Sequence, residues 1–197
     1  RSAGRVADLT AETENQQLTG ETGIAHTRWA THGAPCERNA HPHISNGLAV
    51  VHNGIIENHE TLRAELKAAG YEFTSDTDTE VIAHLVHQNL AGSADVAAAV
   101  RAACTRLIGA YAIGVIQQDN PHTAIVAREG SPLVLGLADD ANYAASDTAA
   151  LLQVTRRMVY LENGDVAVLT PERIDITRHD GTPVSREETE SQLSADA

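Results

Sequence analysis

The sequence predicts an α+β fold with mainly antiparallel sheets, and two observations support this class. Helical patterns cluster between residues 58 and 107, whereas strand-like runs precede and follow them. Helices that are segregated in this way, instead of alternating with strands, are typical of α+β proteins and not of doubly wound sheets. Asn163-Gly164 and Asp180-Gly181 are turn signals between strand-like runs, which indicates tight turns between antiparallel strands.

The first half of the chain is expected to hold the helices. After a polar opening to Thr22, the expected elements are a strand at 23–29, a strand at 48–51, a helix at 58–70, a short strand at 71–74, a helix at 77–90 and a helix that starts at 93. Asn58 is a favoured N-cap residue, and Gly70 is a favoured helix stop. The Thr-Asp-Thr-Glu run at 77–80 has the pattern of a capping box.

The second half of the chain is expected to hold strands, because its hydrophobic period changes at residue 110. The expected strands cover 110–116, 123–127, 133–137, 142–145, 158–161, 166–169, 174–177 and 183–184. No repeat, low-complexity tract or Pro/Gly-rich linker divides the 197 residues, so one compact domain is expected.

Composition limits the classes of partner. With 14 basic and 27 acidic residues the net charge is −13, which argues against nucleic acid or an anionic membrane as a partner. No apolar run approaches the length of a membrane span, and no signal-peptide pattern opens the chain. Two cysteines without a pairing pattern fit a reducing compartment, so a cytoplasmic location is expected.

The stretch His26–Gly33, HTRWATHG, gathers several polar groups in one short segment. Arg28, Trp29, Thr31 and His32 offer a guanidinium, an indole, a hydroxyl and an imidazole within five positions. A guanidinium fork matches the two oxygens of a carboxylate, and a neighbouring hydroxyl adds a third donor. The segment is therefore a candidate loop for binding a small carboxylate.

A second polar element follows the strand at 48–51, which ends in His52-Asn53-Gly54. A side-chain amide beside a glycine N–H at a strand end can stabilise a developing oxyanion. The alternative is an ordinary polar turn in which the glycine has a positive φ angle.

Four elements in order resemble the class II, N-terminal-nucleophile glutamine amidotransferases. They are HTRWATHG, NAHPH at 39–43, VVHNGIIEN at 50–58 and TDTE at 77–80. Within that class the chain is most similar to the glutaminase domains of the glutamine–fructose-6-phosphate aminotransferases (isomerizing), from about Gly4 to the C-terminus. The resemblance implies the four-layer αββα sandwich of the N-terminal-nucleophile hydrolases.

The resemblance also implies roles for individual residues in glutamine hydrolysis through a thioester. Arg28 matches the anchor of the glutamine α-carboxylate, and Asp78 matches the acceptor of its α-ammonium, although a carboxylate there also suits a helix start. Asn53 and Gly54 match the oxyanion hole. Trp29, Thr31 and His32 match further residues of the glutamine-binding loop. His41 matches a position near the site, but no role for it follows.

The implied partners are glutamine and a second, sugar-phosphate isomerase domain that binds fructose 6-phosphate and uses the ammonia for glucosamine 6-phosphate synthesis. Residues 187–197 resemble the start of the linker to that absent domain, and the full-length enzyme is expected to be a homodimer. No cofactor is expected. Ten histidines raise the question of a metal site, but no HExxH, CxxC or paired His/carboxylate spacing supports one, so no metal is expected.

The chain departs from the family at the nucleophile, which is the first residue of the mature enzymes, a cysteine. This chain begins with Arg1, so an opening stretch of a few dozen residues is expected to be missing, and a protein of these residues alone is expected to be inactive and poorly stable. Cys36 and Cys104 have no identifiable base partner. Two other readings remain: a class II amidotransferase with a different acceptor, or a non-catalytic glutamine-binding domain.

Overall fold

Two antiparallel sheets form the centre of the computed structural model, which describes residues 1–197 except 3, 18, 29–33, 91–94 and 193–197. The first sheet has the strand order β1 (His43–Ser45), β2 (Leu48–Ile56), β3 (Gly109–Gln117), β4 (Asn120–Glu129), β8 (Asp165–Leu169) and β9 (Ile174–Arg178). The second has the order β10 (Glu188–Glu190), β7 (Arg157–Tyr160), β5 (Val134–Leu137) and β6 (Asn142–Ala145).

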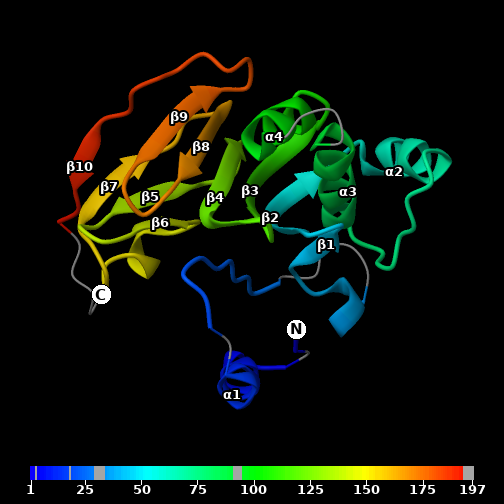
Figure 1. Ribbon diagram of the computed structural model, residues 1–197, viewed down its shortest axis with the longest axis horizontal. Coiled ribbons are helices and arrows are strands. Elements are labelled where there is room, and N and C mark those ends of the chain that lie inside the picture. The colour runs from blue at the N-terminus through cyan, green and yellow to red at the C-terminus, as the bar shows by residue number, and fades with distance from the viewer. Residues whose placement is uncertain (3, 18, 29–33, 91–94, 193–197) are drawn as a thin grey trace.

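The helices lie mainly on one face of the first sheet (Figure 1). They are α1 (Val6–Gln16), α2 (His59–Ala68), α3 (Asp78–Leu90) and α4 (Val96–Cys104), with short 3₁₀ turns η1 (Glu37–Asn39) and η2 (Thr148–Ala150). The largest apolar core lies between α2–α4 and the first sheet. A second core, which includes Leu135, Val159 and Ala167, lies between the two sheets. The predicted α+β class, with antiparallel sheets packed face to face, is confirmed.

The outer face of the second sheet has a smaller cover. Leu151 and Leu152, which follow η2, pack there against Val134 and Met158. In the described part of the chain no long helix covers this face (Figure 1). None of the described helices combines the length and the apolar composition that crossing a bilayer requires.

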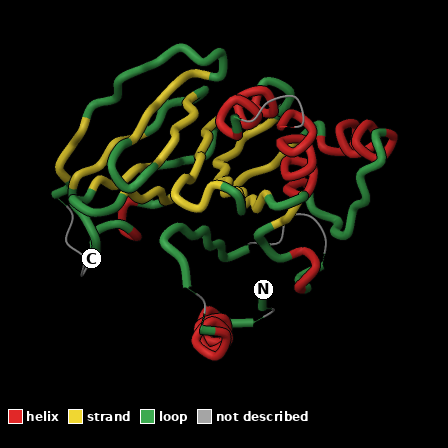
Figure 2. The backbone as a smooth tube through the Cα atoms, viewed as in Figure 1, coloured by secondary structure: helices red, strands yellow, loops and turns green. Residues whose placement is uncertain are grey.

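The opening of the chain stands apart from the sandwich. Helix α1 has no buried residue, and it was not expected from the sequence because its polar pattern lacks an apolar stripe. From α1 the chain runs as loop beneath the sheets (Figure 2). Residues 23–28, which were expected to be a strand, belong to this loop and pair with no strand.

Helix α2 ends as expected but begins differently. Gly70 has φ +92, and the N–H of Tyr71 reaches the carbonyl of Leu66, which closes the helix in a Schellman motif. Asn58 occupies the N-cap position without a side-chain cap. Its amide instead donates to the carbonyl of Arg106 and accepts from the N–H of Ile108, and so joins α2 to the start of β3.

Glu80 explains why residues 71–74 do not form the expected strand. Its carboxylate, 3% exposed, accepts hydrogen bonds from the backbone N–H and the hydroxyl of both Thr74 and Ser75 at 2.6–2.8 Å. Within 71–74 the backbone N–H of Thr74 is therefore used by Glu80, and the N–H of Tyr71 is used by Leu66, so neither is available for a sheet ladder. The expected capping box is half formed, since Thr77 Oγ1 accepts from the N–H of Glu80 at 3.4 Å.

The two glycine turns have different outcomes. Asp180-Gly181 forms a tight turn, after which Pro183 bridges back to Thr177, as expected. The turn at Asn163-Gly164 does not join paired strands, because β7 belongs to the second sheet and β8 to the first. Buried Asp165, the first residue of β8, holds the segment that passes from the second sheet to the first through its hydrogen bonds.

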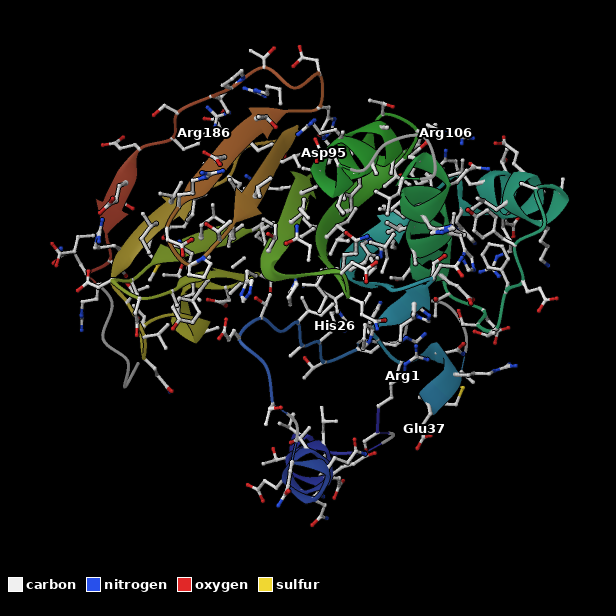
Figure 3. The ribbon with its side chains drawn as sticks, viewed as in Figure 1. Arg1, His26, Glu37, Asp95, Arg106 and Arg186 are labelled. Carbon is white, nitrogen blue, oxygen red and sulfur yellow. The ribbon has the colours of Figure 1, made fainter. Side chains whose placement is uncertain are left out.

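Asp165 accepts from the backbone N–H of Glu162 at 2.8 Å and from Arg186 at 2.7 and 2.8 Å. Arg186 lies on the segment between β9 and β10 (Figure 3). The range 187–197, expected as the start of a linker, contains β10, which pairs with β7, and residues 193–197 lie outside the described residues.

Replacing Glu80 with Gln should lower the free energy of unfolding by about 2 kcal/mol at pH 7, because an amide N–H₂ then faces hydrogen-bond donors. Burial opposes the charge of Glu80, but the hydrogen bonds from Ser75 and Thr74 outweigh it and lower the pKa. The carboxylate therefore stabilises the fold above about pH 4.5, and this stability is lost as the pH falls through the lower folded pKa.

Chemical denaturation of the natural protein that contains this chain, at pH 7 and at pH 3, measures both effects. Glu60→Gln, at an exposed position of α2, is the matched control and should change stability by less than about 0.5 kcal/mol. Equal losses for the two variants, or a Glu80→Gln loss that is as large at pH 3 as at pH 7, would contradict the assignment.

Candidate functional site

A cavity of about 340 Å³ lies where the end of β2 meets the start of α3. It brings together four predicted site residues that are far apart in sequence: Arg28, Asn53, Gly54 and Asp78. The other lining residues are His26, Thr27, His41, His52, Ile55, Thr77 and Thr79. The predicted residues Trp29, Thr31 and His32 lie outside the described residues.

Asp78 is the first residue of α3 and lies in the wall of the cavity, 4% exposed. Its Oδ2 accepts the backbone N–H of Ile56 at 2.9 Å, which holds the helix start against β2. The carboxylate of Asp78 therefore both stands at a helix start and lines the cavity, so the two interpretations are compatible. One oxygen is used structurally, and the helix dipole favours the negative charge.

Arg28 brings a positive charge to the same cavity. Its Nη1 donates to the carbonyl of Ala34 at 3.4 Å, and the same carbonyl accepts from Nδ2 of Asn39 at 3.0 Å. Fully buried Asn39 also accepts the N–H of Asp76, and so ties the arginine segment to the turn before α3. A cavity with a guanidinium and a carboxylate suits a zwitterionic amino acid.

Gly54 is required by the close approach of β2 and β3. Its φ is +124, and a Cβ there would lie 2.0 Å from the carbonyl oxygen of Ala110. Only glycine fits this position, so the expected positive φ is confirmed. The expectation of a polar turn is wrong, because β2 continues through His52-Asn53-Gly54 to Ile56 and Gly54 pairs with Tyr111 of β3. The neighbouring Asn53 is exposed, and its Oδ1 lies 2.7 Å from Nε2 of His26.

A hydrogen-bonded series of histidines runs along the wall of the cavity, and the sequence did not reveal it. Nδ1 of His41 lies 2.8 Å from Nδ1 of His26, and Nε2 of His41 lies 2.9 Å from Oγ1 of Thr79. The same hydroxyl lies 3.1 Å from Nδ1 of His52. The NAHPH element therefore supplies a link between the arginine segment and α3, and the short spacing of its histidines was the only signal in the sequence.

Burial keeps these rings neutral. It lowers the pKa of His26, and together with the neighbouring imidazoles it lowers the pKa of His41 to about 2. Burial lowers the pKa of His52 as well, although the nearby carboxylate of Asp78 opposes this shift. Each ring therefore carries one N–H at neutral pH. In the described ranges, no group of three or more His, Cys, Asp or Glu side chains could hold a metal ion.

Neither cysteine lines the cavity. Cys104 ends α4 and is 3% exposed, and burial raises the pKa of its thiol to about 12. Cys36 is half-buried and precedes η1. Cys104 is a small buried residue of the main apolar core.

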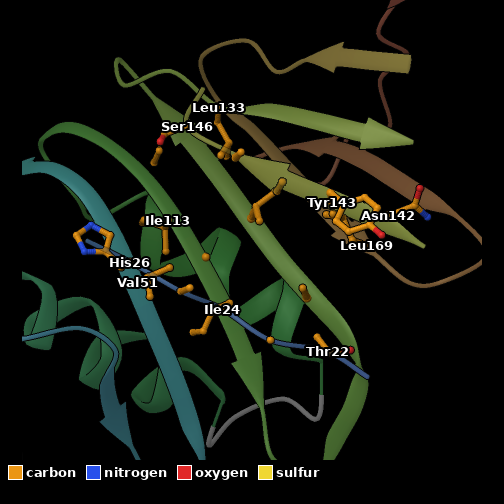
Figure 4. Close-up of a pocket in the computed structure, with 18 of the residues that line it drawn as sticks. Thr22, Ile24, His26, Val51, Ile113, Leu133, Asn142, Tyr143, Ser146 and Leu169 are labelled. Carbon is orange, nitrogen blue, oxygen red and sulfur yellow. The ribbon is translucent and has the colours of Figure 1, made fainter. Parts of the chain in front are cut away.

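A larger cavity of about 410 Å³ lies between the two sheets (Figure 4). Its walls are mostly apolar, with Val51 and Ile113 on one side and Leu133 and Tyr143 on the other. His26, His52 and Asn53 line both cavities, so the polar site and the space between the sheets adjoin at these residues.

Comparisons with known proteins match this chain to one family. The model of the glutamine amidotransferase domain family matches residues 26–153. The glutamine–fructose-6-phosphate aminotransferase (isomerizing) of Acidithiobacillus ferridurans is 60% identical and that of Escherichia coli K12 is 52% identical, each over 100% of this chain and 32% of the relative. The chain thus spans about a third of the length of these relatives.

Solved structures agree. A glutamine phosphoribosylpyrophosphate amidotransferase from B. subtilis has a TM-score of 0.65 and 30% identity, over 78% of this chain and 34% of that one. A glutamine aminotransferase class-II domain protein from Silicibacter pomeroyi, at 19% identity and a TM-score of 0.52 over 72% of this chain and 70% of that one, shares the fold. Because the family model covers well over half of its residues, this chain belongs to the glutamine amidotransferase domain family.

Proposed function

We propose that this chain is the glutamine-hydrolysing domain of an enzyme that makes glucosamine 6-phosphate from fructose 6-phosphate. The observation that carries the proposal is the convergence of Arg28, Asp78, Asn53 and Gly54 on one cavity. Relatives at 52–60% identity over the whole chain, all named glutamine–fructose-6-phosphate aminotransferase, support the choice of acceptor.

The proposed binding mode uses the two charges of the cavity. Arg28 binds the α-carboxylate of glutamine, and Asp78 accepts its α-ammonium through the oxygen that Ile56 does not occupy. The side-chain amide of glutamine then extends toward Asn53 and Gly54. Trp29, Thr31 and His32 complete the binding loop in this proposal.

The proposed chemistry proceeds through a thioester. A thiolate sulfur bonds to the amide carbon of glutamine, and the carbonyl oxygen becomes an oxyanion that accepts from the amide of Asn53 and the N–H of Gly54. The C–N bond then breaks, ammonia leaves with a transferred proton, and water cleaves the thioester to glutamate. Donors aimed at the oxyanion favour the tetrahedral state over the planar amide.

The thiol of this mechanism comes from outside the 197 residues. Cys104 is buried in the helical core, and neither Cys104 nor Cys36 lines the cavity. The sugar phosphate binds on a separate isomerase domain, which residues after 187 lead toward, and the full-length enzyme is a homodimer. In this proposal the chain supplies the glutamine site, and the ammonia released there is used at the isomerase domain.

The first test is catalysis by the natural protein that contains this chain. It should release glutamate from glutamine and form glucosamine 6-phosphate when fructose 6-phosphate is added. The B. subtilis neighbour acts with phosphoribosylpyrophosphate by its name, so this acceptor is the matched control and should yield no aminated product. Glutamate release with amination of a different acceptor would replace the proposed substrate, and no glutamate release would contradict the glutaminase assignment.

The second test separates binding from chemistry. Arg28→Ala should mainly raise KM for glutamine, because the carboxylate is held before and during the reaction. Asn53→Ala should mainly lower kcat, by on the order of 10²–10³, because the oxyanion exists only in the tetrahedral state. Steady-state kinetics of both variants measure the split. An Asn53→Ala variant that changes KM alone would remove Asn53 from the oxyanion hole.

The third test concerns the thiols. A protein of only these 197 residues should release no glutamate. In the natural protein that contains this chain, iodoacetamide at pH 8 should label Cys36 but label Cys104 only after unfolding, because the thiol of Cys104 is buried and remains protonated. Mass spectrometry of the labelled protein, with and without glutamine, measures this. Labelling of Cys36 that glutamine prevents would mean that Cys36 is at the site.

A further inference from the structure

The amide of Asn53 must face the cavity with its N–H₂ group if it is to donate to an oxyanion. A side-chain amide can rotate by half a turn with little change in shape, and the wrong orientation would present its oxygen to the developing negative charge. Something must therefore hold the amide in one orientation. This requirement rests on the function proposed above, and the histidines that line the cavity meet it.

The orientation is determined from the far end of the histidine chain, at His52. Nε2 of His52 is buried and makes no hydrogen bond of normal geometry to the described residues, so the backbone of Ala110, which also interacts with this ring, does not supply Nε2 with an acceptor. A buried N–H without an acceptor costs more than an unused lone pair. Nδ1 of His52 also lies 4.0 Å from Oδ2 of Asp78, which favours a proton on Nδ1 and not a lone pair there. The proton of His52 is therefore on Nδ1.

The next link is the hydroxyl of Thr79, which is 1% exposed. Its recorded partners within the described structure are Nδ1 of His52 and Nε2 of His41. Because His52 donates to this oxygen, the hydroxyl proton has one acceptor left, and it is donated to Nε2 of His41. That nitrogen therefore carries a lone pair.

The remaining links follow in turn. A neutral His41 whose Nε2 accepts must carry its proton on Nδ1, and it donates that proton to Nδ1 of His26 at 2.8 Å. His26 must then carry its proton on Nε2, which lies 2.7 Å from Oδ1 of Asn53. In each hydrogen bond of the series from His52 to Asn53, the group nearer to His52 is the donor and the group nearer to Asn53 is the acceptor.

We propose that His26, whose tautomer is set by His41, Thr79 and His52, is a positioning residue that donates to the side-chain oxygen of Asn53 and turns its N–H₂ group into the cavity. His26 does not touch the reacting atoms in this proposal. The sequence element NAHPH thereby gains a role, because His41 accepts from Thr79 of α3 and donates to His26 on the arginine segment.

The direct test is the tautomer of each ring. In the natural protein labelled with ¹⁵N-histidine, NMR spectra that correlate ring nitrogens with ring carbon-bound protons distinguish Nδ1–H from Nε2–H, and single His→Gln variants assign the signals. The proposal requires Nε2–H for His26 and Nδ1–H for His41 and His52. An Nδ1–H tautomer for His26 overturns it. This readout needs no turnover, so it decides the proposal even if the protein hydrolyses no glutamine.

The kinetic test uses variants that differ in one donor. His26→Ala should lower kcat by about 10–100-fold with KM for glutamine within about threefold, a smaller loss than removal of the Asn53 donor itself. His26→Gln keeps an N–H near the position of Nε2 and should recover most of kcat, whereas the shorter His26→Asn should not. Thr79→Ser, which keeps the hydroxyl, should leave kcat close to that of the parent, whereas Thr79→Val, which removes it, should lower kcat. His122→Gln, at an exposed histidine, is the control and should match the parent.

The double variant His26→Ala/Asn53→Ala separates positioning from general support of the fold. If His26 acts through Asn53, the double variant has the kcat of Asn53→Ala alone. Multiplied losses, or a His26→Gln variant no faster than His26→Asn, overturn the proposal. A protein in which Asn53→Ala lowers kcat but His26→Ala does not would keep the proposed function and reject the role of His26.

Discussion

The site depends on how the first turn of α3 docks against the end of β2. This contact is polar and buried: Ser75, Thr77, Asp78, Thr79 and Glu80 are each at most 5% exposed. Buried polar groups are tolerated only when they are hydrogen-bonded, so each one specifies a position for its partner. A purely apolar contact is not directional, so it would define the rotation of the helix about its axis and its position along the sheet less precisely.

The carboxylates of this turn have separate tasks. Glu80 points back to the backbone of Thr74 and Ser75, whereas Asp78 points across to the N–H of Ile56. The first shapes the loop that enters the helix, and the second sets the distance from helix to sheet. Asp78 uses one oxygen for this contact and also lines the cavity, where we propose that it accepts the α-ammonium of glutamine.

The electrostatic character of the cavity follows from burial. Of the described side chains that line it, Arg28 is cationic and Asp78 is anionic, while burial lowers the pKa of the histidines His26, His41 and His52 so that they stay neutral. A neutral ring donates one hydrogen bond and accepts one. In a row of such rings, the donor at one end therefore fixes the donor and acceptor nitrogens of all the others. Charged rings would be donors only, and neighbouring rings at 2.8 Å would then repel.

Local chemistry along the chain was sufficient to predict much of this protein. The α+β class, the helix stop at Gly70 and the Asp180-Gly181 turn follow from residue type and spacing. The motifs around Arg28, Asn53 and Asp78 were also visible, because polar groups at strand and helix ends stand out against apolar runs. Their convergence on one cavity was an expectation from family resemblance.

Tertiary structure decided what local pattern could not. Residues 71–74 have the composition of a strand, but Glu80 of α3 takes the backbone N–H of Thr74, and Leu66 of α2 takes that of Tyr71. Asn163-Gly164 has the signature of a hairpin, yet the ladder partners of β7 and β8 lie in different sheets. His41 had no role from sequence, because its two partners lie 15 and 38 positions away. Turn type and helix ends depend on residues that are neighbours in sequence. Strand pairing and the donor or acceptor role of each histidine nitrogen depend instead on which hydrogen-bonding groups the fold brings together.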